Sequence, residues 1–140
     1  NRDFMASANI LFLSHEQLTS SPPDFIHALW DRYQNQVIVI GMGDQGAMLG
    51  TYKDKTIVQI PAIQVCPILN TIGAGDALFS AFLSTFQTTK DPLLSLQKAI
   101  LFAAHKIGSV GAAEGFVGTE TLSSLFNQYQ SQLDAIVIRF

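Results

Sequence analysis

The chain has 140 residues, of which 48% are hydrophobic and only 14% are charged, and its formal net charge at pH 7 is −3. A chain of this length can bury roughly 70% of the surface that it exposes when unfolded, which suffices for one domain spanning residues 1–140. The acidic balance argues against nucleic acid and against anionic membranes as partners, because both bind basic surfaces. Apolar runs stop well short of the ~20 residues that a membrane span requires.

Cysteine and histidine usage narrows the chemistry further. Cys66 is the only cysteine, so no internal disulfide can form. This fits a reducing compartment and predicts a cytoplasmic location. The three histidines, at positions 15, 27 and 105, lack the spacing of metal ligands, and we expect them to have structural or solvated roles.

The predicted elements alternate between strands and helices. Residues 8–13 form an apolar run of strand length, and Pro22–Asp24 is a typical helix start that an apolar face continues to Tyr33. Residues 36–40 are β-branched without alternation, which is typical of a strand buried on both faces of a parallel sheet. Residues 46–61 predict a hairpin around the polar turn at 53–55.

The second half of the chain is predicted to be mainly helical. The expected elements are a loop over 66–73, helices over 74–86, about 92–108 and about 119–130, a Gly/Ala-rich loop over 108–118, and a short strand over 135–138. Strands that alternate with helices in this way predict an α/β fold.

Residues 41–46 match the pattern G-x-G-x-x-G directly after a buried strand. A dinucleotide site would need a helix that begins at Gly46, whereas the following residues predict a strand. The motif therefore predicts a glycine-rich turn between two strands. A further possibility is a turn whose bare backbone lets a nucleotide approach closely, because glycine lacks a β-carbon.

The most informative segment precedes the helix predicted from residue 74. Gly73, Ala74 and Gly75 leave the backbone bare where the first N–H groups of the helix have no internal partner, which predicts an anion site. Asp76 falls in the first helical turn. It could act as a general base for a hydroxyl that attacks a phosphoryl group. Alternatively, it only complements the helix dipole, and spacing alone does not separate these two roles.

This segment resembles a known family signature. Thr71-Ile72-Gly73-Ala74-Gly75-Asp76-Ala77 is similar to the D-T-x-G-A-G-D motif of the ribokinase-like (PfkB) carbohydrate kinases. The glycine turn at 41–46 and the Ala-rich stretch at 99–115 match further features of that family, and residues 106–118 weakly resemble its ketohexokinase branch. The resemblance covers roughly residues 8–125.

The resemblance implies a ribokinase-like, Rossmann-like fold: a three-layer α/β/α sandwich with the C-terminal part of a mostly parallel sheet plus a β-hairpin. It implies ATP-dependent phosphorylation of a sugar alcohol group, with Mg²⁺ and K⁺ as cofactors. Asp76 would be the catalytic base and Gly73, Ala74 and Gly75 the anion hole. The implied nucleotide-binding residues are Gly41, Gly43, Gly46, Ala104, Ser109 and Gly115. The implied monovalent-cation residues are Asn70, Ile72, Val110, Ala113 and Gly115.

The chain departs from the family pattern in several places. Asn70 replaces the first aspartate of the signature, Gly41 replaces the threonine before the glycine turn, and Gln17 replaces the glutamate of an N-x-x-E motif that falls on residues 14–17. Glu16 is the neighbouring carboxylate that could substitute for it.

The resemblance also implies a much longer protein, so we expect residues 1–140 to correspond to the C-terminal nucleotide-binding half, without the N-terminal half that carries the substrate site and lid. Two alternatives therefore stay open: a non-catalytic nucleotide-binding relic or inactive fragment, and a kinase of a nucleoside, pyridoxal or hydroxymethylpyrimidine. A sheet that ends at an unpaired strand further predicts self-association, or pairing with the missing half.

Overall fold

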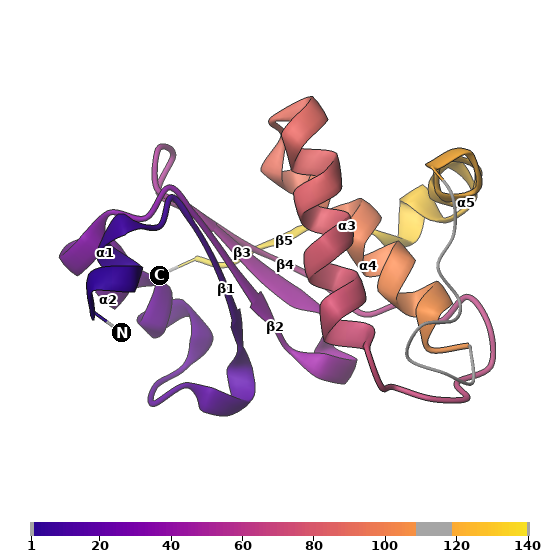
Figure 1. Cartoon of the computed structure of the whole chain (residues 1–140), viewed down its shortest axis with the longest axis horizontal. Helices are drawn as coiled ribbons and strands as arrows, with labels where there is room; N and C mark the ends of the chain where they lie inside the picture. Colours follow the sequence, from indigo (N-terminus) through magenta and orange to yellow (C-terminus); the bar gives the residue numbers. More distant parts are fainter. Residues whose placement is uncertain (1, 109–118, 140) are drawn as a thin grey trace.

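The computed structural model describes residues 2–108 and 119–139 (Figure 1). Its elements in chain order are α1 (Arg2–Ser7), β1 (Ile10–Ser14), η1 (His15–Gln17), α2 (Pro22–Tyr33), β2 (Val37–Gly41), η2 (Gly43–Gln45), β3 (Ala47–Thr51), β4 (Thr56–Ile60), α3 (Ala74–Thr89), α4 (Pro92–Lys106), α5 (Thr119–Tyr129), η3 (Gln130–Gln132) and β5 (Ile136–Val137). The elements labelled η are short 3₁₀ helices. Every strand and every α-helix that the sequence predicted is present, and α1 is an addition.

The strands form one sheet in the order β1-β2-β3-β4-β5. β1 and β2 are parallel, whereas the pairings β2–β3, β3–β4 and β4–β5 are antiparallel. The α/β class and the hairpin are therefore confirmed. The sheet within this chain is mixed rather than mostly parallel, because the hairpin and β5 contribute three antiparallel pairings.

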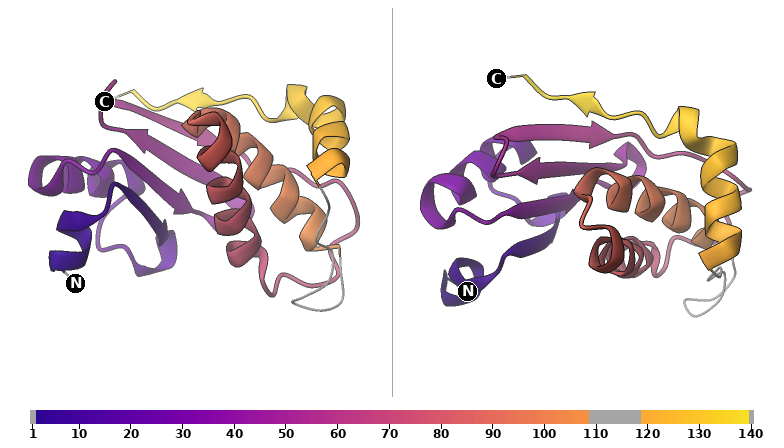
Figure 2. Two further views of the ribbon diagram at one scale, coloured as in Figure 1. Left: turned by 45° about the horizontal axis from the view of Figure 1, so that its top comes forward. Right: turned by 90° about the horizontal axis from the view of Figure 1, so that it is seen from above.

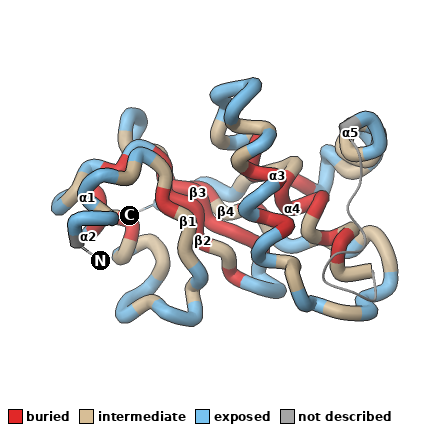
Figure 3. Tube along the Cα trace, in the orientation of Figure 1, coloured by how far each residue is buried: buried red, intermediate tan, exposed pale blue. Residues whose placement is uncertain are grey.

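Helices cover both faces of this sheet, which confirms the three-layer arrangement (Figure 2). Val37 and Val39 of β2 face α3 and α4, whereas Ile38 and Ile40 face α2. All four are buried, and Figure 3 shows that the buried residues run through the strands and the inner sides of α3 and α4. The unbroken apolar run of β2 is thus explained by burial on both faces.

The helices begin where the sequence provides caps. Ser21 accepts a hydrogen bond from the Asp24 N–H at 3.3 Å before α2, and Asp91 accepts one from the Leu94 N–H at 3.1 Å before α4. Each cap satisfies one of the N–H groups that a helix end leaves unpaired, and a proline follows it.

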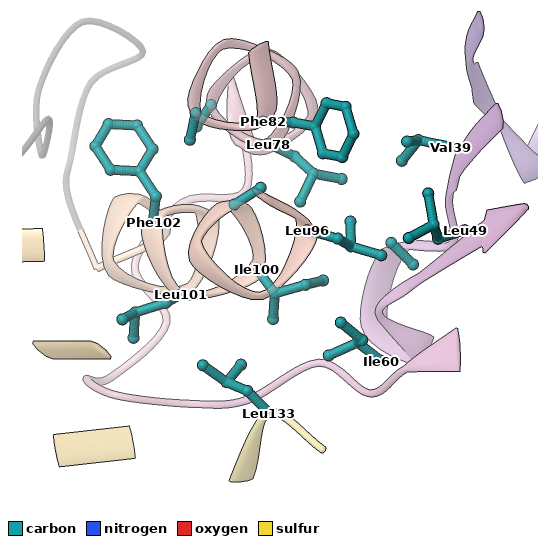
Figure 4. Packing of buried hydrophobic residues seen from close by; sticks show 14 of the residues in the cluster. Val39, Leu49, Ile60, Leu78, Phe82, Leu96, Ile100, Leu101, Phe102 and Leu133 are labelled. Carbon is teal, nitrogen blue, oxygen red and sulfur yellow. The ribbon is translucent and has the colours of Figure 1, made fainter. Parts of the chain in front are cut away.

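α3 and α4 pack against one face of the sheet around a single apolar cluster (Figure 4). Phe82 and Leu78 of α3 point toward Val39 of β2, and Leu96 of α4 points toward Leu49 of β3. Burial of side chains of this size contributes about 1.5–3 kcal/mol each. This packing holds the beginning of α3 at the end of the sheet where the candidate site lies.

α1 depends on contacts that no periodicity in the sequence indicates. The buried Asn35 donates two hydrogen bonds from Nδ2, to the Met5 and Ala8 carbonyl oxygens, both at 2.7 Å. The amide thus holds the end of α1 and the start of β1 from 27 to 30 residues away.

Among the described residues, none of the helices has the length and apolar character needed to cross a membrane.

Candidate functional site

Three candidate segments meet at one end of the sheet. β1 and β2 are parallel and end side by side, with Ser14 paired to Gly41. The start of α3 lies next to them, since a β-carbon placed on Gly41 would lie 3.6 Å from Cδ2 of Leu78 (Figure 1). Phe12 of β1 also contacts Phe79 of α3, with ring centroids 5.0 Å apart. The carboxyl ends of strands in α/β sheets are the usual place for ligands.

The glycine turn is held by its own backbone. The Met42 N–H donates to the Gly46 carbonyl at 2.8 Å, and the Gly46 N–H donates to the Gly43 carbonyl at 3.2 Å. Gly43 and Gly46 have positive φ angles of 60° and 90°, which favour glycine. β3 begins at Ala47, so no helix starts at Gly46 and the condition for a dinucleotide site is not met.

Close packing of the backbone also requires glycine at position 46. A β-carbon on Gly46 would overlap the carbonyl oxygen of Ile60 and would come within 2.6 Å of the Ala62 nitrogen. Gly43 is different, because the nearest atom that its β-carbon would meet is Cε1 of His15 at 3.8 Å. Gly43 therefore keeps an accessible backbone, whereas Gly46 is required by the fold.

His15 is a residue for which the sequence predicted a structural or solvated role, without indicating its partner. Its Nδ1 lies 3.1 Å from the Gly41 carbonyl oxygen, so the ring links the end of β1 to the end of β2. Glu16 and Gln17 follow it in η1, and both are exposed. No local signal marks His15, because its contact arises only when the two parallel strands pair.

The segment Gly73–Asp76, here called the anion site after the role that the motif predicts for it, forms the start of α3. Gly73 caps α3 with a left-handed φ of 81°. The Ala74 N–H donates to the Thr71 carbonyl at 3.2 Å. Within the described part of the chain, the N–H groups of Gly75 and Asp76 have no hydrogen-bond partner.

The surroundings of the anion site are open. A β-carbon on Gly75 would meet no atom within 4 Å, and both Gly75 and Asp76 are exposed. The Asp76 carboxyl group belongs to the first turn of α3. N–H donors, the positive end of a helix dipole and a carboxylate thus lie within one helical turn.

The loop before the anion site is attached to the end of α4. The N–H groups of Leu69 and Asn70 both donate to the Ile107 carbonyl, at 2.8 and 3.0 Å. The Asn70 side chain folds back, and its Oδ1 accepts a hydrogen bond from the Ile72 N–H at 2.9 Å. These bonds bring Asn70, a residue of the implied cation site, next to the end of α4.

Of the remaining residues implied for the nucleotide and cation sites, only Ala104 lies within the described part of the chain. Ala104 is buried in α4, and its carbonyl oxygen lies 3.7 Å from the Cys66 thiol sulfur. The other residues implied for the nucleotide and cation sites lie outside the described residues: Ser109, Val110, Ala113 and Gly115.

Two further surface hollows lie elsewhere. One, of about 250 Å³, lies between the β3–β4 hairpin and the start of α4, and the other, of about 390 Å³, lies between α3, α4 and α5. Neither is lined by residues of the anion site or the glycine turn. No group of three His, Cys, Asp or Glu side chains that could hold a metal ion is found in residues 2–108 or 119–139.

The fold and the site together define an α/β domain in which a helix N-terminus with free N–H groups lies at the carboxyl ends of two parallel strands, and comparison with known proteins gives its family. The family described as pfkB family carbohydrate kinase matches residues 4–119. Because this match spans most of the chain, the chain belongs to the pfkB family of carbohydrate kinases.

Two curated relatives show how much of a family member the chain represents. It is 33% identical over 104 residues to the deoxyribokinase of Salmonella typhi, covering 74% of this chain and 31% of the relative. It is 28% identical over 111 residues to the 1-phosphofructokinase of Haloferax volcanii, covering 79% of this chain and 34% of the relative. The chain thus spans about a third of the length of these relatives.

Solved structures agree with this assignment. A microbiome-derived acarbose kinase superposes with a TM-score of 0.81 at 26% identity, covering 90% of this chain and 43% of that one. The fructokinase of Vibrio cholerae O395, in its fructose-, ADP- and calcium-bound form, has a TM-score of 0.72 at 24% identity, covering 84% and 41%. The ribokinase of Arabidopsis thaliana complexed with ribose and ATP has a TM-score of 0.76 at 18% identity, covering 89% and 43%. The ribokinase-like fold is therefore confirmed.

Proposed function

We propose that this chain is the nucleotide-binding part of an ATP-dependent kinase that phosphorylates an alcohol group of a sugar. The observation that carries the proposal is the anion site, where the unpaired N–H groups of Gly75 and Asp76 adjoin the Asp76 carboxylate at the start of α3. The names of the relatives, a deoxyribokinase and a 1-phosphofructokinase, support a sugar as the class of acceptor.

The anion site would stabilise the phosphoryl group during transfer. Negative charge spreads over the phosphoryl oxygens in the transition state, and fixed N–H donors at a helix N-terminus stabilise it without reorganisation. The small side chains of Gly73, Ala74 and Gly75 leave the backbone accessible to these oxygens. The dipole of α3 adds a partial positive charge at the same end.

Asp76 would act as the general base. Its carboxylate would accept the proton of the sugar hydroxyl while that oxygen forms a bond to the γ-phosphorus of ATP. The bond between the γ-phosphorus and the β,γ-bridging oxygen breaks, and ADP leaves with that electron pair. Base catalysis of this kind typically contributes about 10² to 10⁴ in rate.

The glycine turn would accommodate the nucleotide. Gly43 has an accessible backbone beside His15, and Gly41 ends β2 next to the start of α3. Gly46 gives the turn its shape through its contact with Ile60. The kinship to a ribokinase structure that contains ATP supports this role, and with Ala104 these residues are the described part of the proposed nucleotide site.

Magnesium would be held mainly by the nucleotide. Mg²⁺ usually keeps several waters and binds one or two carboxylates together with substrate phosphates. Glu16, an exposed carboxylate two residues after the end of β1, would be one such carboxylate. Bound Mg²⁺ would neutralise charge on the phosphates. A K⁺ site at Asn70 and Ile72 stays a prediction, as does a cytoplasmic location.

Substitution of Asp76 tests the proposal in the full-length protein. Asp76→Asn should lower kcat by about 10² to 10⁴ and leave the affinity for MgATP nearly unchanged, because the amide keeps the shape but accepts no proton. ADP release in a coupled assay measures the rate. Asp134→Asn is the matched control, because Asp134 is an exposed carboxylate after α5 and η3, outside the site. Unchanged turnover of Asp76→Asn would remove the base from the mechanism.

Titration of the 140-residue chain with MgATP separates the remaining alternatives. Binding supports a nucleotide-binding part, and the absence of binding supports an inactive fragment. If the full-length protein binds MgATP but transfers no phosphate to a sugar, a nucleoside, pyridoxal or hydroxymethylpyrimidine, it is a non-catalytic relic, whereas transfer to one of the last three would replace the sugar as acceptor. The substitutions at Asn70 and Gln17 are the observations that favour this alternative.

A further inference from the structure

His15 follows β1 directly and is fixed to the neighbouring strand by one ring nitrogen. Its Nδ1 lies 3.1 Å from the carbonyl oxygen of Gly41, the last residue of β2. A carbonyl oxygen only accepts hydrogen bonds, so Nδ1 carries the hydrogen and donates it. This bond holds the imidazole at the end of the sheet and decides which ring nitrogen remains for another partner.

The second ring nitrogen of His15, Nε2, is the remaining group. It makes no hydrogen bond to any described residue, and it is not sealed from solvent. A neutral ring with its hydrogen on Nδ1 offers a lone pair at Nε2, whereas a protonated ring donates hydrogen bonds from both nitrogens. The protonated ring can therefore keep its bond to Gly41 and donate a second hydrogen bond to an anion.

The imidazole of His15 also borders the glycine turn. Its Cε1, the carbon bonded to both ring nitrogens, is the nearest atom that a β-carbon on Gly43 would meet, at 3.8 Å. Gly43 has a positive φ of 60° and no side chain, so its backbone is bare at this point. Because Cε1 and Nε2 are bonded, a group that lies against the backbone of Gly43 also meets the Cε1–Nε2 edge of the ring.

The ionisable side chains in the three segments at this end of the sheet are mostly acidic. Residues 14–17, 41–46 and 70–76 contain no lysine or arginine, and His15 is the only side chain among them that can carry a positive charge. The other ionisable side chains in these segments are carboxylates: Glu16, Asp44 and Asp76. A nucleoside triphosphate bound here would add several negative charges, so a cation beside its phosphates would offset repulsion.

We propose that His15 binds a phosphate group of the nucleotide through Nε2, while Nδ1 keeps the ring on the Gly41 carbonyl. This inference rests on the proposed function and adds a substrate-contacting residue to it. The bond to Gly41 fixes the direction of Nε2, and the protonated ring supplies positive charge beside the bare backbone of Gly43. Hydrogen bonds from a charged donor to a phosphate oxygen are stronger than those between neutral groups. His15 takes no proton from the sugar, since the proposed mechanism gives that role to Asp76.

Asparagine at position 15 separates the roles of the two ring nitrogens. The amide nitrogen of asparagine takes the place of Nδ1, so His15→Asn can keep the bond to Gly41 but has no group in the place of Nε2. In calorimetric titrations of the 140-residue chain at about pH 6, where imidazole is largely charged, His15→Asn should bind MgATP on the order of tenfold more weakly than the unmodified chain. Adenosine, which carries no phosphate, should bind with unchanged affinity.

The pH dependence of MgATP binding gives a readout that a structural role of His15 would not move. Imidazole loses its charge as the pH rises, so the ratio of MgATP affinities between the unmodified chain and His15→Asn should be larger at about pH 6 than at about pH 8. Protonation of ATP itself affects both chains equally and cancels in this ratio. Lys53→Asn is the matched control, because it removes a positive charge from the exposed turn between β3 and β4, at the end of β3 far from the glycine turn. It should bind MgATP like the unmodified chain.

The inference fails if Nε2 of His15 adds no affinity that is specific to phosphate. If the unmodified chain binds MgATP and His15→Asn binds it equally well, or if their affinity ratio is the same at both pH values, this inference alone is overturned. An equal loss for MgATP and adenosine, or an equal loss in Lys53→Asn, overturns it as well.

Should His15→Asn not fold, His15→Lys and His15→Gln replace it in the comparison. The charged lysine should then bind MgATP more tightly than the neutral glutamine, and equal affinities overturn the inference. Failure of the unmodified chain to bind MgATP contradicts the proposed function, and this inference with it.

Discussion

Gly46 and Ile60 lie in such close backbone contact that a β-carbon on Gly46 would overlap the Ile60 carbonyl oxygen. The φ of Gly46 is also positive, at 90°. Gly46→Ala should therefore lower the free energy of unfolding by on the order of 2–4 kcal/mol, since both strain and overlap must be relieved. Urea denaturation measures the change. A loss below 0.5 kcal/mol, the size of an ordinary surface substitution, would contradict the contact.

Gly75→Ala should weaken MgATP binding without lowering the stability of the chain. The space around its β-position is open, and alanine is a better helix former than glycine, so stability should stay the same or rise by up to about 1 kcal/mol. The added methyl group should nevertheless obstruct the approach of a phosphoryl group to the anion site, and weaken MgATP binding. Retained affinity in this variant would show that phosphate does not approach the helix end at Gly75.

Gly108 and Cys66 form a second pair whose packing can be tested directly. A β-carbon on Gly108 would overlap the Cys66 sulfur and would lie 3.3 Å from the His105 carbonyl oxygen. Gly108→Ala should cost about 1–3 kcal/mol, as overpacking usually does. Cys66→Ala should recover much of this loss in the double variant, because the sulfur is then absent. Strict additivity of the two substitutions in thermal unfolding would show that the residues do not touch.

The N-terminal cap of α4 at Asp91 can be tested by substitution. Its side chain accepts a hydrogen bond from the Leu94 N–H at 3.1 Å, and its carbonyl accepts the Ser95 hydroxyl at 2.6 Å. Asp91→Ala should cost about 1 kcal/mol through loss of the cap, whereas Asp91→Asn should cost less, since an amide oxygen caps as well. Denaturant midpoints compare the two variants. If both variants kept the midpoint of the unmodified chain, the cap would contribute nothing.

The local signals in the sequence were sufficient for most of the fold. The helix start at Pro22–Asp24, the unbroken β-branched run of β2 and the helical periods of α3 and α4 all depend on neighbouring residues, and each element formed as predicted. The helix start at Gly73–Asp76 was predictable for the same reason, because it consists of consecutive residues.

Features that depend on distant residues were not predictable in this way. His15 reaches Gly41 only through parallel strand pairing, and Asn35 holds α1 across 27 to 30 residues. Lys106 looks like an ordinary basic residue at a helix end, and only the three-dimensional structure shows that it is buried. Long-range contacts of this kind leave no periodic trace in a single sequence.

The outer edge of β1 leads to a last prediction. β1 pairs only with β2 in the described sheet, so one side of its backbone offers N–H and C=O groups for pairing. Phe79 packs on Phe12 beside this edge and keeps 42% of its surface exposed. We therefore expect the isolated chain to self-associate along β1, unless another strand of the longer protein pairs there. Light scattering should show a mass that rises with concentration.

Phe79→Lys should weaken this association, because a charged side chain beside an edge strand opposes pairing. Leu93→Lys, at the start of α4 and 38% exposed, is the matched control and should associate like the unmodified chain. A monomer at all concentrations would contradict the prediction. Equal weakening by both substitutions would place the contact elsewhere, because a general increase in charge, rather than the edge of β1, would then explain the effect.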